Sequence, residues 1–370
     1  MVTVVLLLVV LATVLVMIGS SRRPAPPFGL AKPGLIAFDA NGDLFASNPD
    51  GTGLVQLTAG PEFDILATYA PDGTQIAFES QQPDFSFDVF AMPADGSARV
   101  RVIEGLAETA PIAWSPDSRH VAVAARPVGE EGGQILIGAI DDPGAVRVGG
   151  SDVFGSDPAW SPDGRRIAFL GTAPCCAGSP DSLLIIDVDG SNAHAVAPNI
   201  GSGARHRTPT SSNRTAGGAQ PAWSADGRRL AFLAPGVGHL PDVHVVDTDG
   251  RNLRNVSNSP EEESDVAWSP DGTRLAYVRM RDGSNSNAFF LVADADGSNP
   301  RPLSGPPLSA DVLVWSPDGA RLLGMAYEDP NTNGFNTPNI IIELDPSGQL
   351  PPVETRISNF GTASYQRLAP

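Results

Sequence analysis

Trp268-Ser269-Pro270-Asp271-Gly272 is one copy of a motif that recurs along the chain, followed within two residues by Arg and then by a short apolar run. Two more clear copies span 160–164 and 315–319, and degenerate copies span 69–73, 114–118 and 223–227. The intervals are 45, 46, 63, 45 and 47 residues between the aspartates of these copies: Asp72, Asp117, Asp163, Asp226, Asp271 and Asp318. A period of this length is typical of a four-stranded propeller blade rather than of a helical solenoid.

Each unit repeats the same order of segments. An apolar strand ends in the aromatic residue, and after the Ser-Pro-Asp-Gly turn comes a second strand such as Ile167-Ala168-Phe169. A third run such as 184–187 then leads through an Asp-Gly turn into a short last strand. Pro presets φ, Asp hydrogen-bonds its own backbone and Gly adopts the left-handed conformation, so these turns predict hairpins. We therefore expect four strands per unit, with the Trp packed between blades.

The two ends of the repeat region complement each other. The first unit begins directly with Leu35-Ile36-Ala37-Phe38 and lacks the innermost strand found in the other units. Ala363-Ser364-Tyr365-Gln366 aligns with that missing strand, and the chain stops soon afterwards. Pairing of the two segments would close the ring and remove an exposed sheet edge. The sequence thus predicts an all-β fold, a β-propeller of seven four-stranded blades.

These repeats resemble those of the TolB-like, WD-like β-propeller repeat family over residues 34 to 370. The resemblance is specific because several motif elements recur in register. The chain departs from the family pattern in replacing Gly by Ser118, Pro by Ala225, and Trp by Tyr69 and Tyr365. It also has one blade more than the six of TolB, so TolB-specific partners are not expected to carry over.

The first 18 residues are almost entirely apolar, with Thr3 and Thr13 as interruptions. This length is close to the minimum for a membrane span and long for the core of a signal peptide, so both readings stand. We expect residues 1–21 to form a hydrophobic helix that acts as a transmembrane anchor or signal peptide. Residues 22–33 would be a Pro-rich linker, and residues 34–370 the propeller.

Two observations predict opposite orientations of this segment in the membrane. Arg22 and Arg23 follow the apolar run, and the positive-inside rule alone would then place the propeller in the cytoplasm. The resemblance implies the opposite, because TolB-like propellers usually work outside the cytoplasmic membrane. We expect a single-pass membrane protein with an extracytoplasmic propeller, or a secreted or periplasmic protein after cleavage.

Composition excludes several partners. A formal net charge of −18 argues against nucleic acid, which requires concentrated positive charge. The two cysteines, Cys175 and Cys176, are adjacent and lack the second pair that a zinc site needs. The Asp-Gly motifs, such as Asp189-Gly190, lack the spacing and the closing Glu of an EF-hand, so hairpin turns are favoured. We expect no metal and no cofactor.

Catalytic motifs are also missing from the sequence. There is no Gly-x-Ser-x-Gly elbow, no His-Glu-x-x-His and no P-loop, and the five histidines are scattered. An enzyme would require residues that only the fold brings together.

Nearly all variation in length falls on one face of the expected ring. The longest connection, 198–220, contains the basic residues Arg205, His206, Arg207 and Arg214. Asp157, Gln220 and Asp265 each lie three residues before a Trp, at the start of an innermost strand, where they could face the central channel. Loops on a rigid ring commonly bind partners, although such insertions can also be neutral.

The sequence therefore predicts a non-enzymatic, membrane-tethered or exported propeller, a monomeric ring that binds a protein, peptide or envelope polymer through this face. The seven residues named in the preceding paragraph are the candidate binding residues. The alternative is a lyase or hydrolase that acts on a glycan or peptide at the channel mouth. A sensor ectodomain is a third reading.

Overall fold

The structure is a computed structural model. It describes residues 31–108, 111–129, 133–142, 144–150, 152–173, 182–198, 200, 220–236, 240–281, 287–303, 309–327, 339–349, 352–358 and 360–368. The expected N-terminal helix, within residues 1–21, lies outside this part, as do most of the linker and the adjacent cysteines. Within the described residues, no helix is long and apolar enough to span a membrane.

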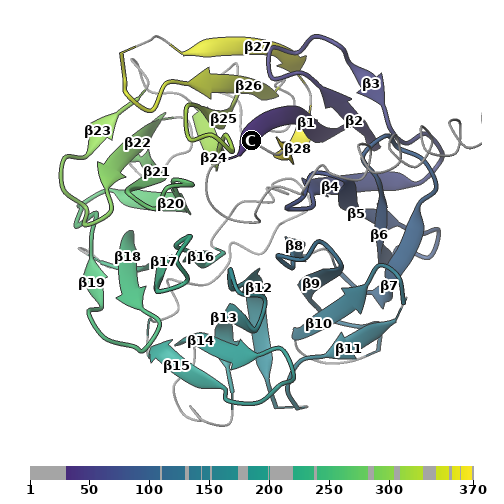
Figure 1. The fold of residues 1–370 in the computed structure, drawn as a ribbon, viewed down its shortest axis with the longest axis horizontal. Helices are drawn as coiled ribbons and strands as arrows, with labels where there is room; N and C mark the ends of the chain where they lie inside the picture. Colours follow the sequence, from purple (N-terminus) through teal and green to yellow (C-terminus); the bar gives the residue numbers. More distant parts are fainter. Residues whose placement is uncertain are drawn as a thin grey trace, which may run out of the picture.

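The described residues form seven antiparallel four-stranded sheets arranged as a ring (Figure 1). From the innermost strand outward, blade 1 consists of β28 (Phe360–Leu368), β1 (Lys32–Ala40), β2 (Asp43–Ser47) and β3 (Val55–Gln56), and blade 2 of β4 (Phe63–Tyr69), β5 (Gln75–Gln81), β6 (Phe87–Pro93) and β7 (Val100–Leu106). Blade 3 consists of β8 (Ala113–Trp114), β9 (His120–Ala125), β10 (Gln134–Ala139) and β11 (Ala145–Arg147), and blade 4 of β12 (Phe154–Trp160), β13 (Arg166–Thr172), β14 (Ser182–Asp187) and β15 (His194–Ala197). Blades 5 to 7 consist of β16 (Ala222–Trp223), β17 (Arg229–Pro235), β18 (Pro241–Asp247) and β19 (Arg254–Asn255); β20 (Glu262–Trp268), β21 (Arg274–Met280), β22 (Ala288–Asp294) and β23 (Arg301–Pro302); and β24 (Ser309–Trp315), β25 (Leu322–Tyr327), β26 (Asn339–Leu344) and β27 (Val353–Ser358). The predicted fold, with seven blades of four strands, is confirmed.

Blade 1 is assembled from both ends of the repeat region, as predicted. Ile36, Ala37 and Phe38 of β1 pair with Tyr365, Ser364 and Ala363 of β28 in antiparallel register. The side chain of Gln366 adds two further bonds, accepting from the Leu35 amide at 3.2 Å and donating to the Gly73 carbonyl of blade 2 at 2.7 Å. The closing strand β28 thus pairs with β1 within blade 1 and, through Gln366, hydrogen-bonds to blade 2.

Each Ser-Pro-Asp-Gly turn is held by a network within the turn. In blade 4, Asp163 Oδ1 accepts hydrogen bonds from Ser161 Oγ at 2.6 Å and from the Arg165 amide at 3.1 Å. Ser161 Oγ in turn accepts from the Arg166 amide at 2.9 Å, and Gly164 adopts φ of +70°. The same Ser-to-Asp bond recurs at Ser115–Asp117, Ser224–Asp226, Ser269–Asp271 and Ser316–Asp318. The recurring Ser-Pro-Asp-Gly motif therefore has a structural role in the hairpin.

In blades 3, 5, 6 and 7 the Trp at the end of the innermost strand connects its blade to the preceding one. Its indole N–H donates to a carbonyl of the preceding blade at 3.0 to 3.3 Å for Trp114, Trp223, Trp268 and Trp315. An Arg of the preceding blade also lies over the ring, with the guanidinium carbon 5.2, 4.5 and 4.9 Å from the ring centroid in the pairs Arg166–Trp223, Arg229–Trp268 and Arg274–Trp315. Such cation–π contacts typically contribute about 0.5–2 kcal/mol each.

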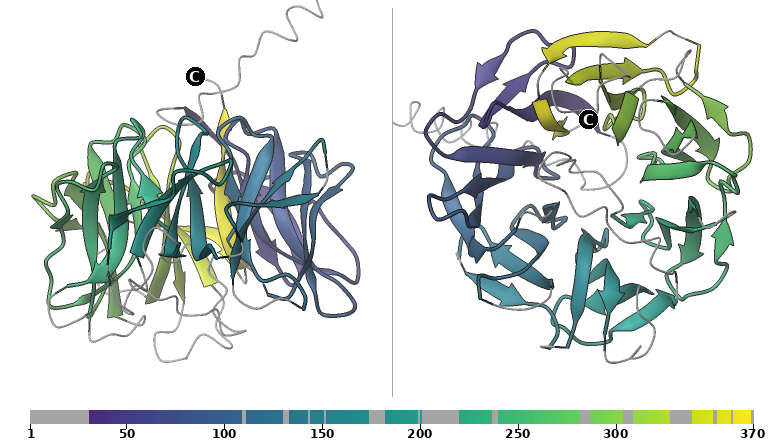
Figure 2. Two further views of the ribbon diagram at one scale, coloured as in Figure 1. Left: turned by 90° about the horizontal axis from the view of Figure 1, so that it is seen from below. Right: turned by 180° about the vertical axis from the view of Figure 1, so that it is seen from behind.

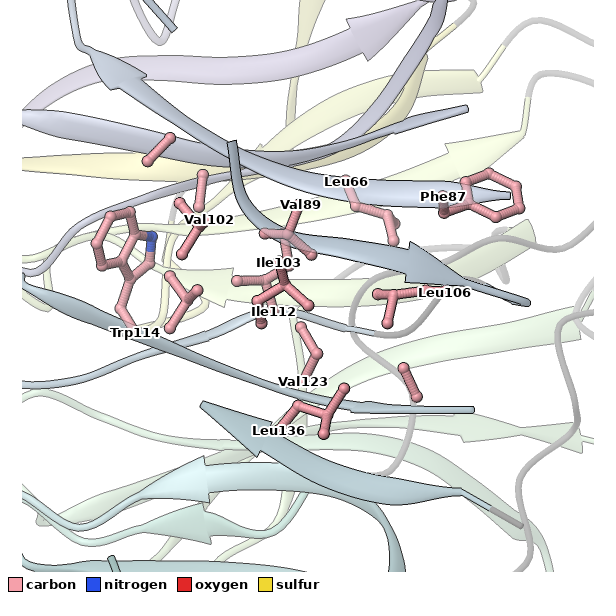
Figure 3. Packing of buried hydrophobic residues seen from close by; sticks show 14 of the residues in the cluster. Leu66, Phe87, Val89, Val102, Ile103, Leu106, Ile112, Trp114, Val123 and Leu136 are labelled. Atoms are coloured by element: carbon pink, nitrogen blue, oxygen red, sulfur yellow. The ribbon is translucent and has the colours of Figure 1, made fainter. Parts of the chain in front are cut away.

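Apolar side chains fill the space between blades. Figure 3 shows the cluster between blades 2 and 3, where Val89, Ile103 and Leu106 of one sheet meet Val123 and Leu136 of the next. Val89 and Val123 are fully buried, and burial of such a side chain contributes roughly 1.5–3 kcal/mol. Each blade is therefore stabilised mainly by its two neighbours.

The ring has two faces, visible edge-on in Figure 2. The turn face carries the Ser-Pro-Asp-Gly turns and the turns between third and fourth strands. The loop face carries the connections between second and third strands and the links between blades. The Ala31 amide donates to the Pro317 carbonyl in a turn of blade 7 at 2.8 Å, so the described chain enters the ring at the turn face.

Candidate functional site

The candidate site is the loop face, where the sequence predicted a binding surface. Arg205, His206, Arg207 and Arg214 belong to the long link between blades 4 and 5 and lie outside the described residues. Their role stays a prediction. The described parts of the face contribute three features: polar residues of the innermost strands, an exposed aromatic loop and a charged cluster between blades 5 and 6.

Asp157 and Asp265 occupy matching positions, each at a β-bulge with left-handed φ of +55° and +51°. Both side chains are buried, and Asp157 has no exposed surface. Asp265 Oδ2 accepts a hydrogen bond from the Leu313 amide of blade 7 at 2.9 Å, and Gln220 donates to the Pro158 carbonyl of blade 4 at 3.3 Å. The bonds of Asp265 and Gln220 therefore join neighbouring blades.

Phe85 lies at the tip of the β5–β6 connection on the loop face. Its side chain is 78% exposed, and its φ of +68° is a conformation that bulky residues rarely adopt. Hydrogen bonds around it fix this geometry: the Phe85 amide donates to the Gln82 carbonyl, and Asp84 Oδ1 accepts from the Ser86 amide and hydroxyl at 3.1 and 2.6 Å. A short, internally bonded loop thus displays an aromatic ring to solvent at a cost in backbone strain.

The Glu263 cluster, which comprises Asp242, Glu261, Glu263, Arg279 and Arg281, lies at the loop-face end of blades 5 and 6. Arg279 Nε is 2.7 Å from Glu263 Oε1 and 3.9 Å from Glu261 Oε2, and Arg281 Nε is 3.1 Å from Glu261 Oε1. Asp242 and Glu263 are buried, whereas the side chain of Arg281 is half exposed. The cluster therefore leads from the blade interior to the surface.

Neutral groups complete the environment of the two buried carboxyls. Ser257 Oγ donates to Glu263 Oε2 at 2.9 Å and accepts from the Val243 amide at the same distance. The Asn255 amide donates to Asp242 Oδ2. Burial and then a hydrogen bond with Asp242 raise the pKa of Glu263 to about 8, although Arg279 and Ser257 oppose the shift. Glu263 therefore retains its proton at neutral pH.

Sequence reasoning missed this cluster although a signal was present. Glu263 follows Glu261 and Glu262 before the predicted innermost strand, and Arg279 and Arg281 alternate at the end of the second strand. Regular register counted back from the Trp268–Leu275 pair would place Ser264 opposite Arg279, and the β-bulge between Glu263 and Val266 brings Glu263 into that position instead. Within the described residues, no group of three His, Cys, Asp or Glu side chains is arranged to hold a metal ion.

Fold and site together define a seven-bladed β-propeller with short turns on one face and the candidate site on the other. The sequence matches no protein-family model and no curated protein. Solved structures similar to it include TolB of Acinetobacter baumannii, with a TM-score of 0.55 and 13% identity over 90% of this chain and 66% of that one. Among the others is an oligogalacturonate lyase of Vibrio parahaemolyticus, with a TM-score of 0.59 and 13% identity over 88% and 90%.

A third neighbour is the propeller domain of the Trilobed protease of Pyrococcus furiosus, with a TM-score of 0.59 and 10% identity over 89% of this chain and 98% of that domain. At these identities the likeness shows the fold alone. The presence of TolB proteins among the neighbours is consistent with the TolB-like resemblance, and the neighbours leave open whether this chain is an enzyme.

Proposed function

We propose that the protein is a non-enzymatic, membrane-tethered propeller that binds a protein, peptide or envelope polymer through its loop face. The observation that carries this proposal is Phe85, an exposed aromatic side chain held in a left-handed backbone conformation. Such strain costs about 1–2 kcal/mol, and an exposed ring gains nothing for the fold that would offset it. Aromatic anchors of this kind are enriched among residues that dominate binding energy.

The tether fits this arrangement. Since the described chain enters at the turn face, an anchor in residues 1–21 would leave the loop face pointing away from the membrane. A propeller outside the cytoplasmic membrane, or one released by cleavage, would then present the loop face to an envelope partner. Protease treatment of right-side-out membrane vesicles tests this placement. An extracytoplasmic propeller should be degraded in intact vesicles, and degradation only after the vesicles are opened would contradict the proposal.

The binding proposal is tested by capture from a crosslinked envelope extract. Phe85→Gly removes the ring and suits the left-handed φ, so capture should fall at least tenfold while the free energy of unfolding stays within about 1 kcal/mol of the parent. Val100→Ala, which removes an exposed apolar side chain from the outer strand of the same blade, is the matched control and should keep capture. Equal capture by Phe85→Gly and the parent would remove this loop from the site.

The connection 198–220 between blades 4 and 5, here called the basic link, is tested separately. Charge reversal at Arg205, Arg207 and Arg214 should abolish capture of an acidic partner and leave thermal unfolding unchanged. Retained capture by this triple variant would exclude the link from the binding surface. The two sets of variants therefore distinguish binding through the Phe85 ring from binding through the charges of the basic link.

A second candidate is an enzyme, a lyase or hydrolase that acts on a glycan or peptide. The raised pKa of Glu263 supports it, because a carboxyl that keeps its proton at neutral pH can act as a general acid, although the buried Glu263 would have to become accessible to a substrate. Turnover of oligosaccharide or peptide libraries that is lost in Glu263→Gln would favour this reading. Turnover that persists in Glu263→Gln, Asp157→Asn and Asp265→Asn would rule out the candidate acids.

A further inference from the structure

The boundary between blades 3 and 4 departs from the pattern of Trp contacts in the rest of the ring. Trp160 is 7% exposed, yet its indole N–H has no hydrogen-bond partner in the described structure. His120 stands where blades 4 to 6 have Arg, and its ring centroid is 6.4 Å from that of Trp160 with the planes tilted by 37°. This Trp therefore lacks both the carbonyl acceptor and the stacked guanidinium that Trp223, Trp268 and Trp315 have.

A cavity of about 830 Å³ opens at this boundary on the turn face. Its apolar lining includes Trp160, Ile137 and Val188, together with Val146, which is 67% exposed. The volume lies within the range of small-ligand and peptide-side-chain pockets and far exceeds one guanidinium group. The His120 side chain, which is smaller than Arg and lines the cavity, thus leaves open space beside the ring of Trp160.

Three carboxylates line the same cavity: Asp117, Asp142 and Asp163. Burial raises the pKa of Asp117 and Asp163, but hydrogen bonds from a Ser hydroxyl and a backbone amide outweigh it, so both pKa values lie below the usual range. These two groups are therefore ionised at neutral pH. Among the described residues that line the cavity there is no Arg or Lys, and the basic residue that lines it is His120, with Nδ1 3.5 Å from Asp117. Arg165 and Arg166, which do not line the cavity, also help to lower the pKa of Asp163.

The sequence of blade 3 departs from the repeat pattern near the cavity. The third-to-fourth-strand turn of blade 4 is Asp189-Gly190-Ser191, in which the Asp is bonded to the Ser. Blade 3 instead has Asp141-Asp142-Pro143-Gly144, and exposed Asp142 lines the cavity. With Ser118 in place of the turn Gly and His120 in place of Arg, three departures from the repeat meet at one boundary.

We propose that this cavity binds an arginine side chain presented by a peptide segment of a partner protein, with the guanidinium stacked on Trp160 between the carboxylates of Asp117 and Asp163. The arginines that cover the corresponding Trp rings of blades 5 to 7 show that this environment accommodates a guanidinium at 4.5 to 5.2 Å. Val146 and Val188 at the rim would contact apolar residues that flank the arginine. This site is on the face opposite the one proposed above and is independent of it.

The test is calorimetric titration of the full chain in detergent micelles with the peptide acetyl-Val-Arg-Val-amide. The matched probe replaces Arg by citrulline, which has nearly the same shape and no charge. We expect the Arg peptide to bind at least tenfold more tightly, because the cation–π contact and the carboxylates act on the charge. Equal affinity for the two peptides, or no binding of either, would overturn the proposal.

Two variants locate the site. His120→Arg introduces the residue that blades 4 to 6 have at this position and should fill the cavity from within, weakening binding at least tenfold. Val146→Lys, at an exposed position where folding is unaffected, should weaken binding at least fivefold by repulsion. Gln75→Arg is the matched control: it introduces Arg at the equivalent position of blade 2, at the boundary between blades 2 and 3. This variant should bind the peptide like the parent. Unchanged binding by both His120→Arg and Val146→Lys would place the peptide elsewhere.

Discussion

Replacing Glu263 by Gln should remove a pH dependence from the stability of the propeller. The pKa of Glu263 is about 8 in the folded protein, against 4.5 for an ordinary Glu in the unfolded chain. Between these values the folded protein keeps the proton and the unfolded chain has lost it, so unfolding releases one proton. The free energy of unfolding should then fall by about 1.4 kcal/mol per pH unit as pH rises through this window.

From pH 5 to pH 7.5 this amounts to roughly 3 kcal/mol for a single proton. Gln keeps the shape of Glu263, stays neutral and can still accept from Arg279 through its carbonyl. The variant should therefore match the parent near pH 5 and exceed its stability near pH 7.5.

Urea denaturation at half-unit pH intervals measures the effect as the difference between parent and variant. The difference matters because other groups titrate nearby: burial lowers the pKa of His244, which gives the opposite slope below pH 6.5, and burial raises that of Asp64. These contributions are common to both proteins and cancel. Asp242→Asn is a second variant that should flatten the curve, because it removes the other carboxyl of the pair. Parallel curves of unfolding free energy against pH for Glu263→Gln and the parent would refute the raised pKa of Glu263.

Three further predictions concern the contacts between strands and blades, each measured by urea denaturation at pH 7. Tyr365→Ala in the closing strand should lower the free energy of unfolding by about 3 kcal/mol, because it empties a buried position at the junction with blade 7; a loss below about 1 kcal/mol would contradict this. Asp265→Ala should cost about 1–3 kcal/mol by leaving the buried Leu313 amide without its acceptor. Arg229→Ala should cost about 1 kcal/mol through loss of the stack on Trp268, and an unchanged stability would mean that the contact contributes nothing.

The fold could be predicted because its determinants are local and repeated. The Trp and the Ser-Pro-Asp-Gly turn mark each unit, so their count gives the blades, and the unmatched segment at Tyr365 identifies the closing strand. The turn chemistry is confirmed in detail, since each Asp accepts the bonds that its motif implies.

The candidate site could be predicted only in part. Asp157 and Asp265 were correctly placed at matching positions, but a bulge changes the direction of a side chain, and sequence alternation does not reveal it. The left-handed conformation of Phe85 was equally invisible, because no Gly or Asn occupies that position. Pairing of Glu263 with Arg279 depends on the same kind of bulge, which shifts the register of β20 by one residue between Glu263 and Val266.

The closing strand also sets the order in which the protein can mature. The Leu35 amide and the Gln366 side chain that bonds to it are 331 positions apart, and such distant contacts slow folding because a long loop must close first. During synthesis β1 therefore remains without its inner partner until β28 has emerged from the ribosome. In that interval the unpaired edge of β1 is open to pairing with other chains, so an export pathway that keeps the chain unfolded until translocation ends would protect it from aggregation.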